Sequence, residues 1–407
     1  MGAKTPLVPV ADARRMIVER MRVLEAETVP LEKALGRVLA SDIVARISHP
    51  AADVSAMDGY AVRAADAAAS STLKIAGESA AGHPWSGEVK PGQAVRIFTG
   101  AYIPTGADSV VIQEDTTAGD GVVTINAAAV LGQHIRKAGQ DFHAGDIGLR
   151  APRRLTARDV GFIGAMNHGE VPVRRRPRVG IISTGDEIVM PGAPVKPGQL
   201  ASANGPGLYA FAVAHGAEAH HFGIAPDNID TLRAMLERAG EVDLLLTSGG
   251  VSVGDHDLMK QVLGDLGLDL AFHKIAMRPG KPLLFGAIKT AKGTAHVMGL
   301  PGNPVAAMIC AIMFLGPALA AMQGLPGNAP ALRTARLGAP MKANDVREDY
   351  IRGSLSTNDD GMLVATPFSR QDSSMVSALA RADALIVRPP FAPAANPGDP
   401  VSVLPLD

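Results

Sequence analysis

The chain has 407 residues, a length that we expect to divide into two to four domains. With 39 basic and 40 acidic residues the formal net charge is -1, which provides no global field for nucleic acid or a membrane surface. An anionic ligand must therefore be met by a local cluster of charge. Cys310 is the single cysteine, which excludes an intrachain disulfide and favours a reducing, cytoplasmic setting. Because it lies in an apolar run, we expect a buried, inert thiol.

The first part of the chain is predicted to be a helical domain with a β insertion. Helical spacing of apolar residues in 10–21 and 31–43 predicts two helices, and it returns in 156–169. Between them lie short alternating runs bounded by Gly, Pro, Asp and Ser, which predict strands. We therefore expect a discontinuous, helical N-terminal domain (1–46 and 140–176) around an inserted β domain (47–139), with strands at 72–77, 93–100, 108–114 and 121–126.

The pattern of 177–326 alternates between strands and helices, which predicts a doubly wound, mainly parallel sheet covered on both faces. A hairpin-like stretch is expected at 272–288, and residues 327–407 are expected to form a C-terminal β domain. The expected strands are 178–183, 217–223, 242–247 and 295–300, and the expected helices are 205–215, 229–240, 257–267 and 305–322.

The last of these helices is uncharged for about 18 residues, the lower limit for crossing a membrane. Gly316-Pro317 interrupts it, and no basic residue follows directly, so we interpret it as a buried core helix.

Three of the predicted strands end in glycine-rich loops with hydroxyl, amide or carboxylate side chains. These loops are STGDEI (183–188), TSGGVSVGDHD (247–257) and GLPGNP (299–304). One such loop is typical of an ordinary turn, but the carboxyl ends of parallel strands share one edge of a sheet, where ligands bind. Glycine also lets backbone N–H groups approach an anion. The three loops together predict a ligand site.

Charged residues near these loops suggest what the ligand is. Lys274, Arg278 and Lys281 suit a phosphate or another oxyanion, although ordinary solvated charge is the plainer interpretation of each alone. Carboxylates in the loops are candidate Mg²⁺ ligands. They are Asp186, Glu187, Asp255 and Asp257, of which Asp186 and Asp255 fit helix N-caps equally well.

In chain order, seven motifs together resemble the MoeA-type molybdopterin molybdenumtransferases, whose eukaryotic relative is the E domain of gephyrin. They are SAMDGYAVRAAD (55–66), RIFTGAYIPTGADSVVIQED (96–115), GQD (139–141), STGDEI, SGGVSVGDHD (248–257), RPGKP (278–282) and GLPGNPVAA (299–307). The resemblance covers essentially the whole chain.

The resemblance implies a four-domain, elongated, L-shaped subunit with a C-terminal β-barrel. It also implies a homodimer whose site lies between the α/β domain of one subunit and the β insertion of the other. The implied reaction is Mg²⁺-dependent insertion of molybdate into adenylylated molybdopterin, with release of AMP. A MogA-type adenylyltransferase would supply the substrate, and apo-molybdoenzymes would receive the product.

Matching the motifs position by position carries the family's roles onto this chain. The implied catalytic residues are Asp58, Thr99, Asp141, Glu187 and Asp257, with Glu187 and Asp257 as metal ligands. The implied substrate-binding residues are Ser183, Thr184, Gly185, Asp227, Ser248, Gly249, Gly250, Lys274, Arg278, Lys281, Pro301, Gly302, Asn303, Pro304, Arg352 and Ser373, with Ser374 an equal candidate for the last.

The chain departs from the family pattern at three places. Arg278 stands where the family usually has lysine, which replaces a compact ammonium by a planar fork. Ala306 replaces a common serine, and His256 lies beside Asp257. Two alternatives remain, a MogA-type molybdopterin adenylyltransferase, which shares only the α/β domain, and a gephyrin-like scaffold, which needs partner-binding extensions.

Overall fold

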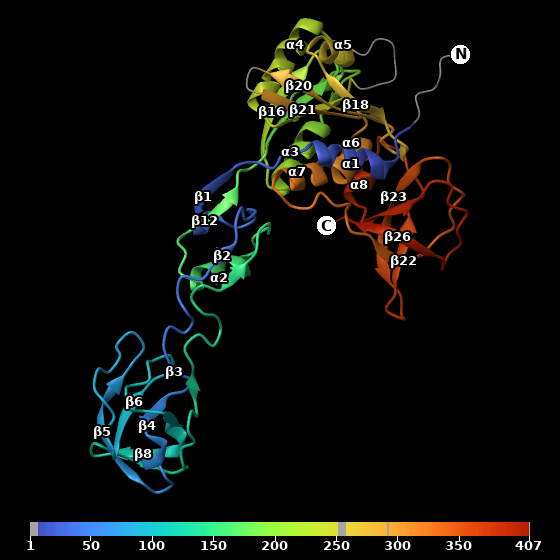
Figure 1. The fold of residues 1–407 in the computed structure, drawn as a ribbon. Coiled ribbons are helices and arrows are strands. Elements are labelled where there is room, and N and C mark those ends of the chain that lie inside the picture. Colours follow the sequence, from blue (N-terminus) through green and yellow to red (C-terminus); the bar gives the residue numbers. More distant parts are fainter. Residues whose placement is uncertain (1–6, 251–257, 291–292, 407) are drawn as a thin grey trace. The chain divides into compact units, whose positions relative to one another are not determined.

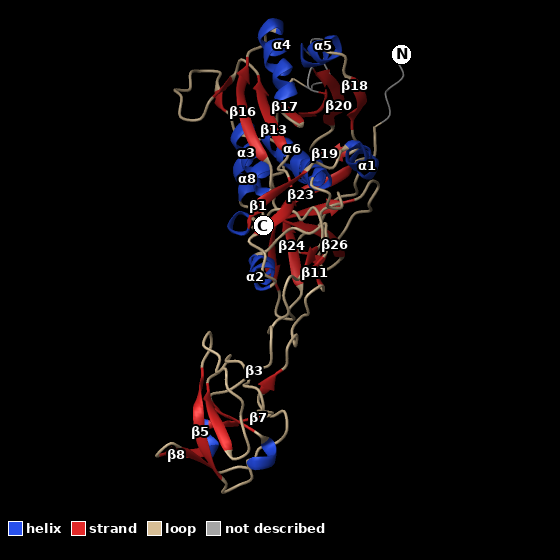
Figure 2. Ribbon diagram, turned by 60° about the vertical axis from the view of Figure 1, so that its left-hand side comes forward, coloured by secondary structure: helices blue, strands red, loops and turns tan. Residues whose placement is uncertain are grey.

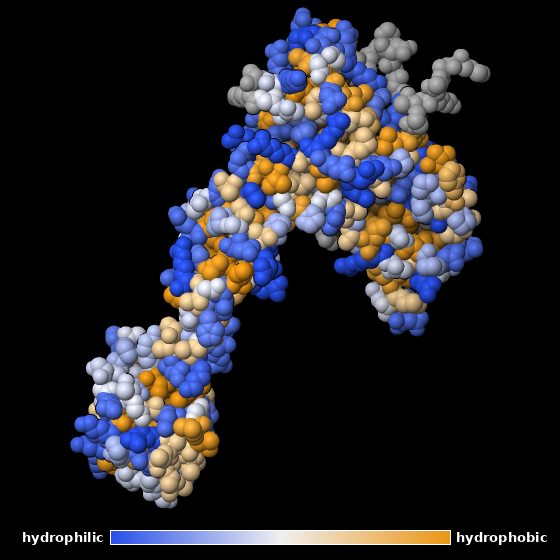
Figure 3. Space-filling view, viewed as in Figure 1, coloured by the Kyte–Doolittle hydropathy of each residue, from blue (hydrophilic) through white to orange (hydrophobic). Residues whose placement is uncertain are grey.

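The computed structural model describes residues 7–250, 258–290 and 293–406. The chain divides into two compact units, residues 1–26 with 174–407 (unit 1) and residues 27–173 (unit 2). Polar and apolar residues are interspersed over the visible face of each unit (Figure 3), as expected for a chain whose opposite charges nearly balance.

The centre of unit 1 is a six-stranded sheet (Figures 1 and 2). Four parallel strands are followed by two antiparallel ones, which confirms the predicted parallel sheet and its hairpin. In spatial order the strands are β16 (Glu218–Ala225), β13 (Arg178–Thr184), β17 (Leu244–Ser248), β21 (Gly293–Leu300), β20 (Pro282–Thr290) and β18 (Asp269–Lys274). A short parallel pair, β14 (Ile188–Val189) and β15 (Leu200–Ala201), follows β13.

Both faces of this sheet are buried, because alternate residues of a strand point to opposite faces. Leu244 and Leu246 of β17 belong to one apolar cluster with α3 (Asn204–Ala214), whereas Leu245 belongs to a second cluster with α4 (Ile229–Glu237) and α5 (Leu258–Asp265). The helices therefore cover the sheet on both sides, which confirms the doubly wound fold.

The uncharged segment near residue 310 is a core helix. It consists of α6 (Pro304–Cys310), a π-helical turn (Ala311–Leu315) and α7 (Gly316–Met322). Within the described residues, Pro304–Met322 is long and apolar enough to cross a membrane, but 83% of it is buried inside the protein. Cys310 is buried in it, and burial raises the pKa of its thiol, as expected for an inert cysteine.

The N-terminal helix packs in unit 1. In α1 (Val10–Arg20), Val10, Ala13 and Ile17 recur at helical spacing and join the apolar cluster that contains α7. The prediction grouped 1–46 with 140–176, whereas residues 1–26 belong to unit 1.

The predicted second helix, over 31–43, is wrong. Only a 3₁₀ turn (Leu31–Lys33) forms there. Gly36 has φ +74°, a left-handed conformation that ends helical geometry. Leu39 then forms an antiparallel β-bridge with Val173, which is distant in sequence, and this pairing replaces the hydrogen bonds of a helix.

The C-terminal domain of unit 1 is a closed five-stranded barrel. Its strand order is β23-β24-β22-β26-β25, and β25 returns to pair with β23. Its apolar side chains Tyr350, Leu385 and Leu404 join the same cluster as α6 and α7, so the barrel and the α/β domain share packing. The strands are β22 (Arg333–Leu337), β23 (Glu348–Thr357), β24 (Leu363–Pro367), β25 (Ala384–Arg388) and β26 (Pro400–Pro405), with β19 (Met277–Arg278) added beside β23 and a short helix α8 (Val376–Ala380).

Unit 2 contains a small helical part and the β insertion. Helix α2 (Ala157–Ala165) begins with a capping box between Thr156 and Asp159, which confirms the helix predicted there. Near it lie the pairs β1 (Ala26–Pro30) with β12 (Glu170–Arg174) and β2 (Ile43–Val44) with β11 (Ile147–Leu149). The insertion is a sheet of β7 (Ser109–Ile112), β4 (Gly59–Val62), β6 (Gln93–Ile97), β5 (Thr72–Ser79), β9 (Val122–Ile125) and β8 (Thr116–Gly119), beside the pair β3 (Val54–Ser55) and β10 (Ile135–Arg136).

The structure explains why a glycine stands at position 59 in the motif SAMDGYA. It lies in β4, where a Cβ would stand 2.0 Å from the backbone oxygen of Val111 on β7. The two strands can pair at this distance only without a side chain. The glycine thereby fixes the backbone next to Asp58.

We predict that Gly59→Ala destabilises unit 2 by about 1–3 kcal/mol, because the strands must move apart to admit the methyl group. Gly119→Ala is the matched control, since a Cβ there meets nothing within 4 Å. Urea unfolding followed by circular dichroism measures both. Equal stability of the two variants would contradict the close approach of β4 and β7.

Candidate active site

The three glycine-rich loops begin at one edge of the sheet. Ser183 of β13 pairs with Ser248 of β17, and Ser248 pairs with Leu300 of β21, so the three strands end in one row. A cleft of about 1100 Å³ lies at this edge. The predicted site residues that line it are Ser183, Thr184, Gly185, Glu187, Asp227, Ser248, Gly249, Gly250, Pro301, Gly302, Asn303 and Pro304.

The loops after β13 and β17 touch through a glycine. Gly249 has φ +93°, and a Cβ there would stand 2.6 Å from Thr184 Oγ1. A larger residue would separate the two loops and widen the cleft. The rest of the second loop, including Asp255 and Asp257, lies outside the described residues.

Asn204 is a cleft residue that the sequence analysis missed. Its Nδ2 donates to Ser248 Oγ at 2.7 Å and to the backbone oxygen of Gly302 at 2.7 Å, which joins two of the three loops. Its Oδ1 and Ser183 Oγ are buried without a hydrogen-bond partner among the described residues, so both remain open to a ligand. The sequence did contain a signal for Asn204. It is an amide at the start of a helix that follows a strand, and helix N-termini bind anions.

Asp186, Glu187 and Asp227 lie near one another, and Glu187 and Asp227 line the cleft. Burial, and then repulsion from Asp186 and Glu187, raise the pKa of Asp227. Asp186 Oδ1 accepts a hydrogen bond from the backbone N–H of Asp227 at 3.0 Å. Asp186 precedes strand β14 and caps no helix, so the N-cap interpretation of Asp186 is wrong.

A second cavity of about 530 Å³ shares Pro282, Pro301 and Asn303 with the cleft. Four cationic side chains line it, together with one carboxylate, that of Asp349. Such a lining suits an oxyanion. The predicted residues Arg278, Lys281, Arg352 and Ser373 belong to it, with Arg347 as a further cation, whereas Lys274 lies in β18 and lines neither space.

The two serine candidates face different spaces. Ser373 lines the second cavity, where its Oγ accepts a hydrogen bond from Asn303 Nδ2 at 2.9 Å. Ser374 lines the cleft, and its Oγ donates to Asp372 at 2.6 Å.

Arg352 is the most buried cation of the second cavity, with 1% of its surface exposed. Its Nε donates to Gln371 Oε1 at 3.1 Å and its Nη1 to the backbone oxygen of Asp372 at 2.9 Å. Burial lowers its pKa. Among the described residues no carboxylate forms an ion pair with it, so its charge is held in place by neutral groups.

The predicted residues of unit 2 form a separate group. The backbone N–H and the hydroxyl of Thr99 donate to Asp58 Oδ1 at 2.7 and 2.8 Å. These bonds hold the pKa of the Asp58 carboxyl below its usual range, so it is ionised at neutral pH. Asp141 is exposed, and its backbone N–H donates to the oxygen of His49.

Three family models match the chain. They are the MoeA N-terminal region (domain I and II) over residues 8–166, a probable molybdopterin binding domain over 180–321, and the MoeA C-terminal region (domain IV) over 334–406.

Proteins of known name and structure are similar over nearly the full length. The molybdopterin molybdenumtransferase of Haemophilus influenzae is 34% identical, over 98% of this chain and 99% of that protein. The one of Bacillus subtilis is 35% identical, over 95% and 91%. The crystal structure of the molybdopterin biosynthesis MoeA protein from Pyrococcus horikoshii matches with a TM-score of 0.84 and 31% identity, over 98% of this chain and 99% of that one.

We predict that Asp227→Asn raises the melting temperature at pH 7. A carboxyl whose pKa is raised in the folded state destabilises the fold once it is ionised, and that effect disappears as the pH falls toward the ordinary value of 3.8. The gain should therefore shrink on acidification. Because Asp227 is only partly desolvated and most of its side chain is exposed, solvent screens the effect and we expect less than about 1 kcal/mol.

The measurement is calorimetric melting between pH 4 and pH 8, with the exposed Asp360→Asn as control. A melting temperature for Asp227→Asn that equals that of the wild type at pH 7 would show that the three carboxylates do not repel one another.

Proposed function

Since the chain belongs to the MoeA family of molybdopterin molybdenumtransferases, we propose that it inserts molybdate into adenylylated molybdopterin, releases AMP and forms molybdenum cofactor. The observation that carries this proposal is the common wall of Pro282, Pro301 and Asn303 between the strand-end cleft and the cationic cavity. The reaction needs two anionic substrates side by side, and these two spaces adjoin.

In this proposal the cleft binds the adenylylated pterin and the cavity binds molybdate. The cleft offers the hydroxyls of Ser183 and Ser248, the free amide oxygen of Asn204, and glycine-rich backbone that an anion can approach. The cavity offers Lys281 and Arg352, which suit an oxyanion with two negative charges. Asn303, held to Ser373 at the common wall, orients the two substrates toward each other.

We assign Asp58, Thr99 and Asp141 to the cleavage of the adenylate. Asp58 is held ionised by Thr99, and an ionised carboxylate is able to accept a proton or bind a cation beside the phosphate.

Mg²⁺ is part of the proposal, and the chemistry of the described carboxylates fits a divalent cation. Desolvation, and then repulsion from Asp186 and Glu187, raise the pKa of Asp227, and a cation would offset the repulsion. Among the described residues no three metal-binding side chains are close enough to hold an ion by themselves. Glu187 and Asp227 would hold it together with Asp257, which lies outside the described residues, and with oxygens of the substrate. When bound, Mg²⁺ would neutralise charge on the phosphate oxygens.

We also propose a cytoplasmic homodimer that takes its substrate from a MogA-type adenylyltransferase and passes the product to apo-molybdoenzymes. The adenylyltransferase alternative is disfavoured because Arg352 and Ser373, which line the cationic cavity, come from the C-terminal domain, outside the α/β domain.

The test is reconstitution with purified protein, adenylylated molybdopterin, Mg²⁺ and molybdate. We expect AMP release and activation of an apo-molybdoenzyme, and loss of both when a chelator removes Mg²⁺. A protein that releases no AMP under these conditions would refute the proposed reaction.

In the same assay Asp58→Asn should reduce AMP release by at least about 10²-fold, within the range for a lost acid–base group. Its melting temperature should fall only slightly, because the side chain is exposed and the remaining amide oxygen can still accept from Thr99, its hydrogen-bond partner among the described residues. Asp120→Asn, at an exposed turn of the same sheet, is the matched control and should behave as the wild type. Full activity of Asp58→Asn at low molybdate would remove Asp58 from the mechanism.

A further inference from the structure

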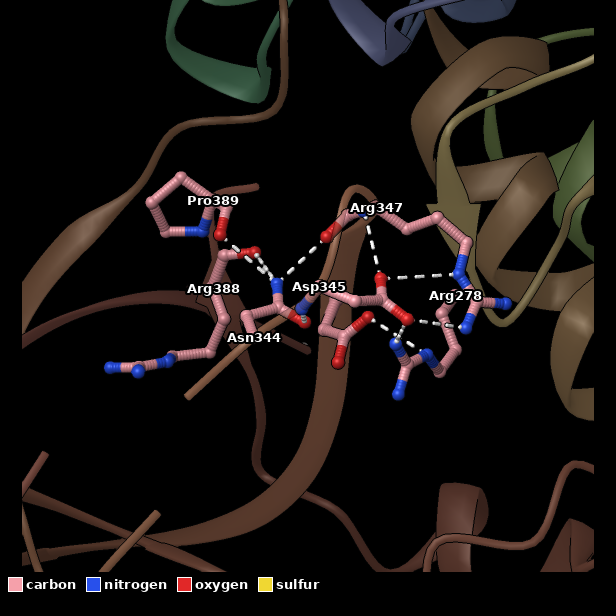
Figure 4. A network of polar contacts seen from close by, with 7 residues as sticks. Arg278, Asn344, Asp345, Arg347, Arg388 and Pro389 are labelled. Carbon is pink, nitrogen blue, oxygen red and sulfur yellow. Dashed lines mark hydrogen bonds and ion pairs between the residues drawn. The ribbon is translucent and has the colours of Figure 1, made fainter. Parts of the chain in front are cut away.

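Two arginines of the cationic cavity are joined by a carboxylate outside its lining (Figure 4). Asp345 Oδ2 accepts from Nη2 of Arg278 and from Nη2 of Arg347, the latter at 2.8 Å. Arg278 and Arg347 line the cavity, whereas Asp345 does not. The carboxylate therefore contacts both guanidinium groups from outside the cavity and leaves the cavity itself free for a ligand.

The position of the Asp345 carboxylate is fixed by its own loop. Its Oδ1 accepts from the backbone N–H of Arg347 at 2.9 Å, and its backbone N–H donates to Asn344 Oδ1 at 2.9 Å. The amide nitrogen of Asn344 in turn contacts the backbone oxygens of Arg347, Arg388 and Pro389 at 2.7 to 3.0 Å (Figure 4). The side chain of Asp345 is thus fixed to its own loop, and Asn344 joins that loop to the segment at Arg388 and Pro389.

Arg278 is held from a second side. Its Nε forms an ion pair with Asp349 Oδ1 at 3.1 Å, and β19 pairs Arg278 with Asp349 through the backbone. A guanidinium has five N–H donors in one plane. The hydrogen bond to Asp345 uses Nη2 and the ion pair to Asp349 uses Nε, whereas Nη1 has no partner among the described residues and remains for a ligand.

The charges of this cluster cancel, since two arginines face two aspartates. Lys281 and Arg352 are the remaining cations of the cavity, and neither forms an ion pair among the described residues. The four cations that line the cavity thus outnumber Asp345 and Asp349 by two, an excess that suits an anion.

We propose that Asp345 is a positioning residue for oxyanion binding, whose fixed carboxylate holds Arg278 and Arg347 as one rigid set of donors toward the cavity. Asp345 does not touch the oxyanion. It keeps two long side chains in a single geometry before the ligand arrives. The identification of that oxyanion with molybdate rests on the proposed function, whereas the positioning role does not.

The experiment is calorimetric titration of the full chain with sodium molybdate, and with sodium sulfate as a second tetrahedral dianion. Asp345→Ala should weaken molybdate binding at least tenfold, because both guanidinium groups lose their common acceptor. Asp345→Asn keeps one of the two acceptor oxygens and should restore part of the affinity, whereas a simple charge effect would make the two variants bind alike. Asp360→Ala removes one exposed negative charge from another loop of the same domain and should bind as the wild type.

Binding by Asp345→Ala as tight as that of the wild type, or tighter, would overturn the proposal, because Asp345 would then be a bystander or a competitor of the oxyanion. Failure of the wild type to bind either dianion would also overturn it. A kinetic readout separates this inference from the proposed function. If the wild type releases AMP, Asp345→Ala should raise KM for molybdate and leave kcat within about twofold; if the wild type binds molybdate with this Asp345 dependence but releases no AMP, the proposed reaction fails and the positioning role stands.

Discussion

Ser183, Ser248 and Leu300 are partners in one row across three parallel strands, and this register brings the site together. Because parallel strands run in the same direction, their ends are held at one edge by the same hydrogen bonds that form the sheet. The register is secured by burial. Leu244, Leu245 and Leu246 are each 0% exposed and pack in the apolar clusters on the two faces of the sheet, so a shift of the strand would disrupt the packing on both.

The cationic cavity depends on a second pairing, between β19 and β23. This pairing brings Arg278, from the long connection between β18 and β20, beside Asp349 and Arg352 of the barrel. Fixing an arginine side chain costs about 2 kcal/mol of rotamer entropy, and here the folded protein has met that cost before a ligand binds. Pro282, Pro301 and Asn303 line both the cavity and the cleft, and Asn303 is held there by its hydrogen bond to Ser373.

The sequence was informative where the signal is local. The apolar run at 242–247 predicted β17, the alternation along 177–326 predicted the doubly wound sheet, and the three loops at one edge predicted the cleft. The spacing over 31–43 was misleading, because the left-handed Gly36 and the pairing of Leu39 with Val173 are decided by the backbone and by a distant partner.

Long-range pairing also explains the uneven outcome for the cations. Arg278, Lys281 and Lys274 are close in sequence, yet Lys274 remains in β18 while the chain then turns to join the barrel. No local pattern in the sequence predicts such a pairing, or the hydrogen bond between Arg278 and Asp345. Asn204 had a signal, at the start of a helix after a strand, but its two partners come from the other two loops.

Anomalous X-ray diffraction from crystals grown with molybdate shows whether molybdate binds in the cationic cavity beside the cleft. Data collected at the molybdenum absorption edge locate the metal without prior assumptions about the site. We expect one strong peak among Arg278, Lys281 and Arg352, next to Asn303. A well-occupied molybdenum peak elsewhere in the protein, with none in this cavity, would contradict it.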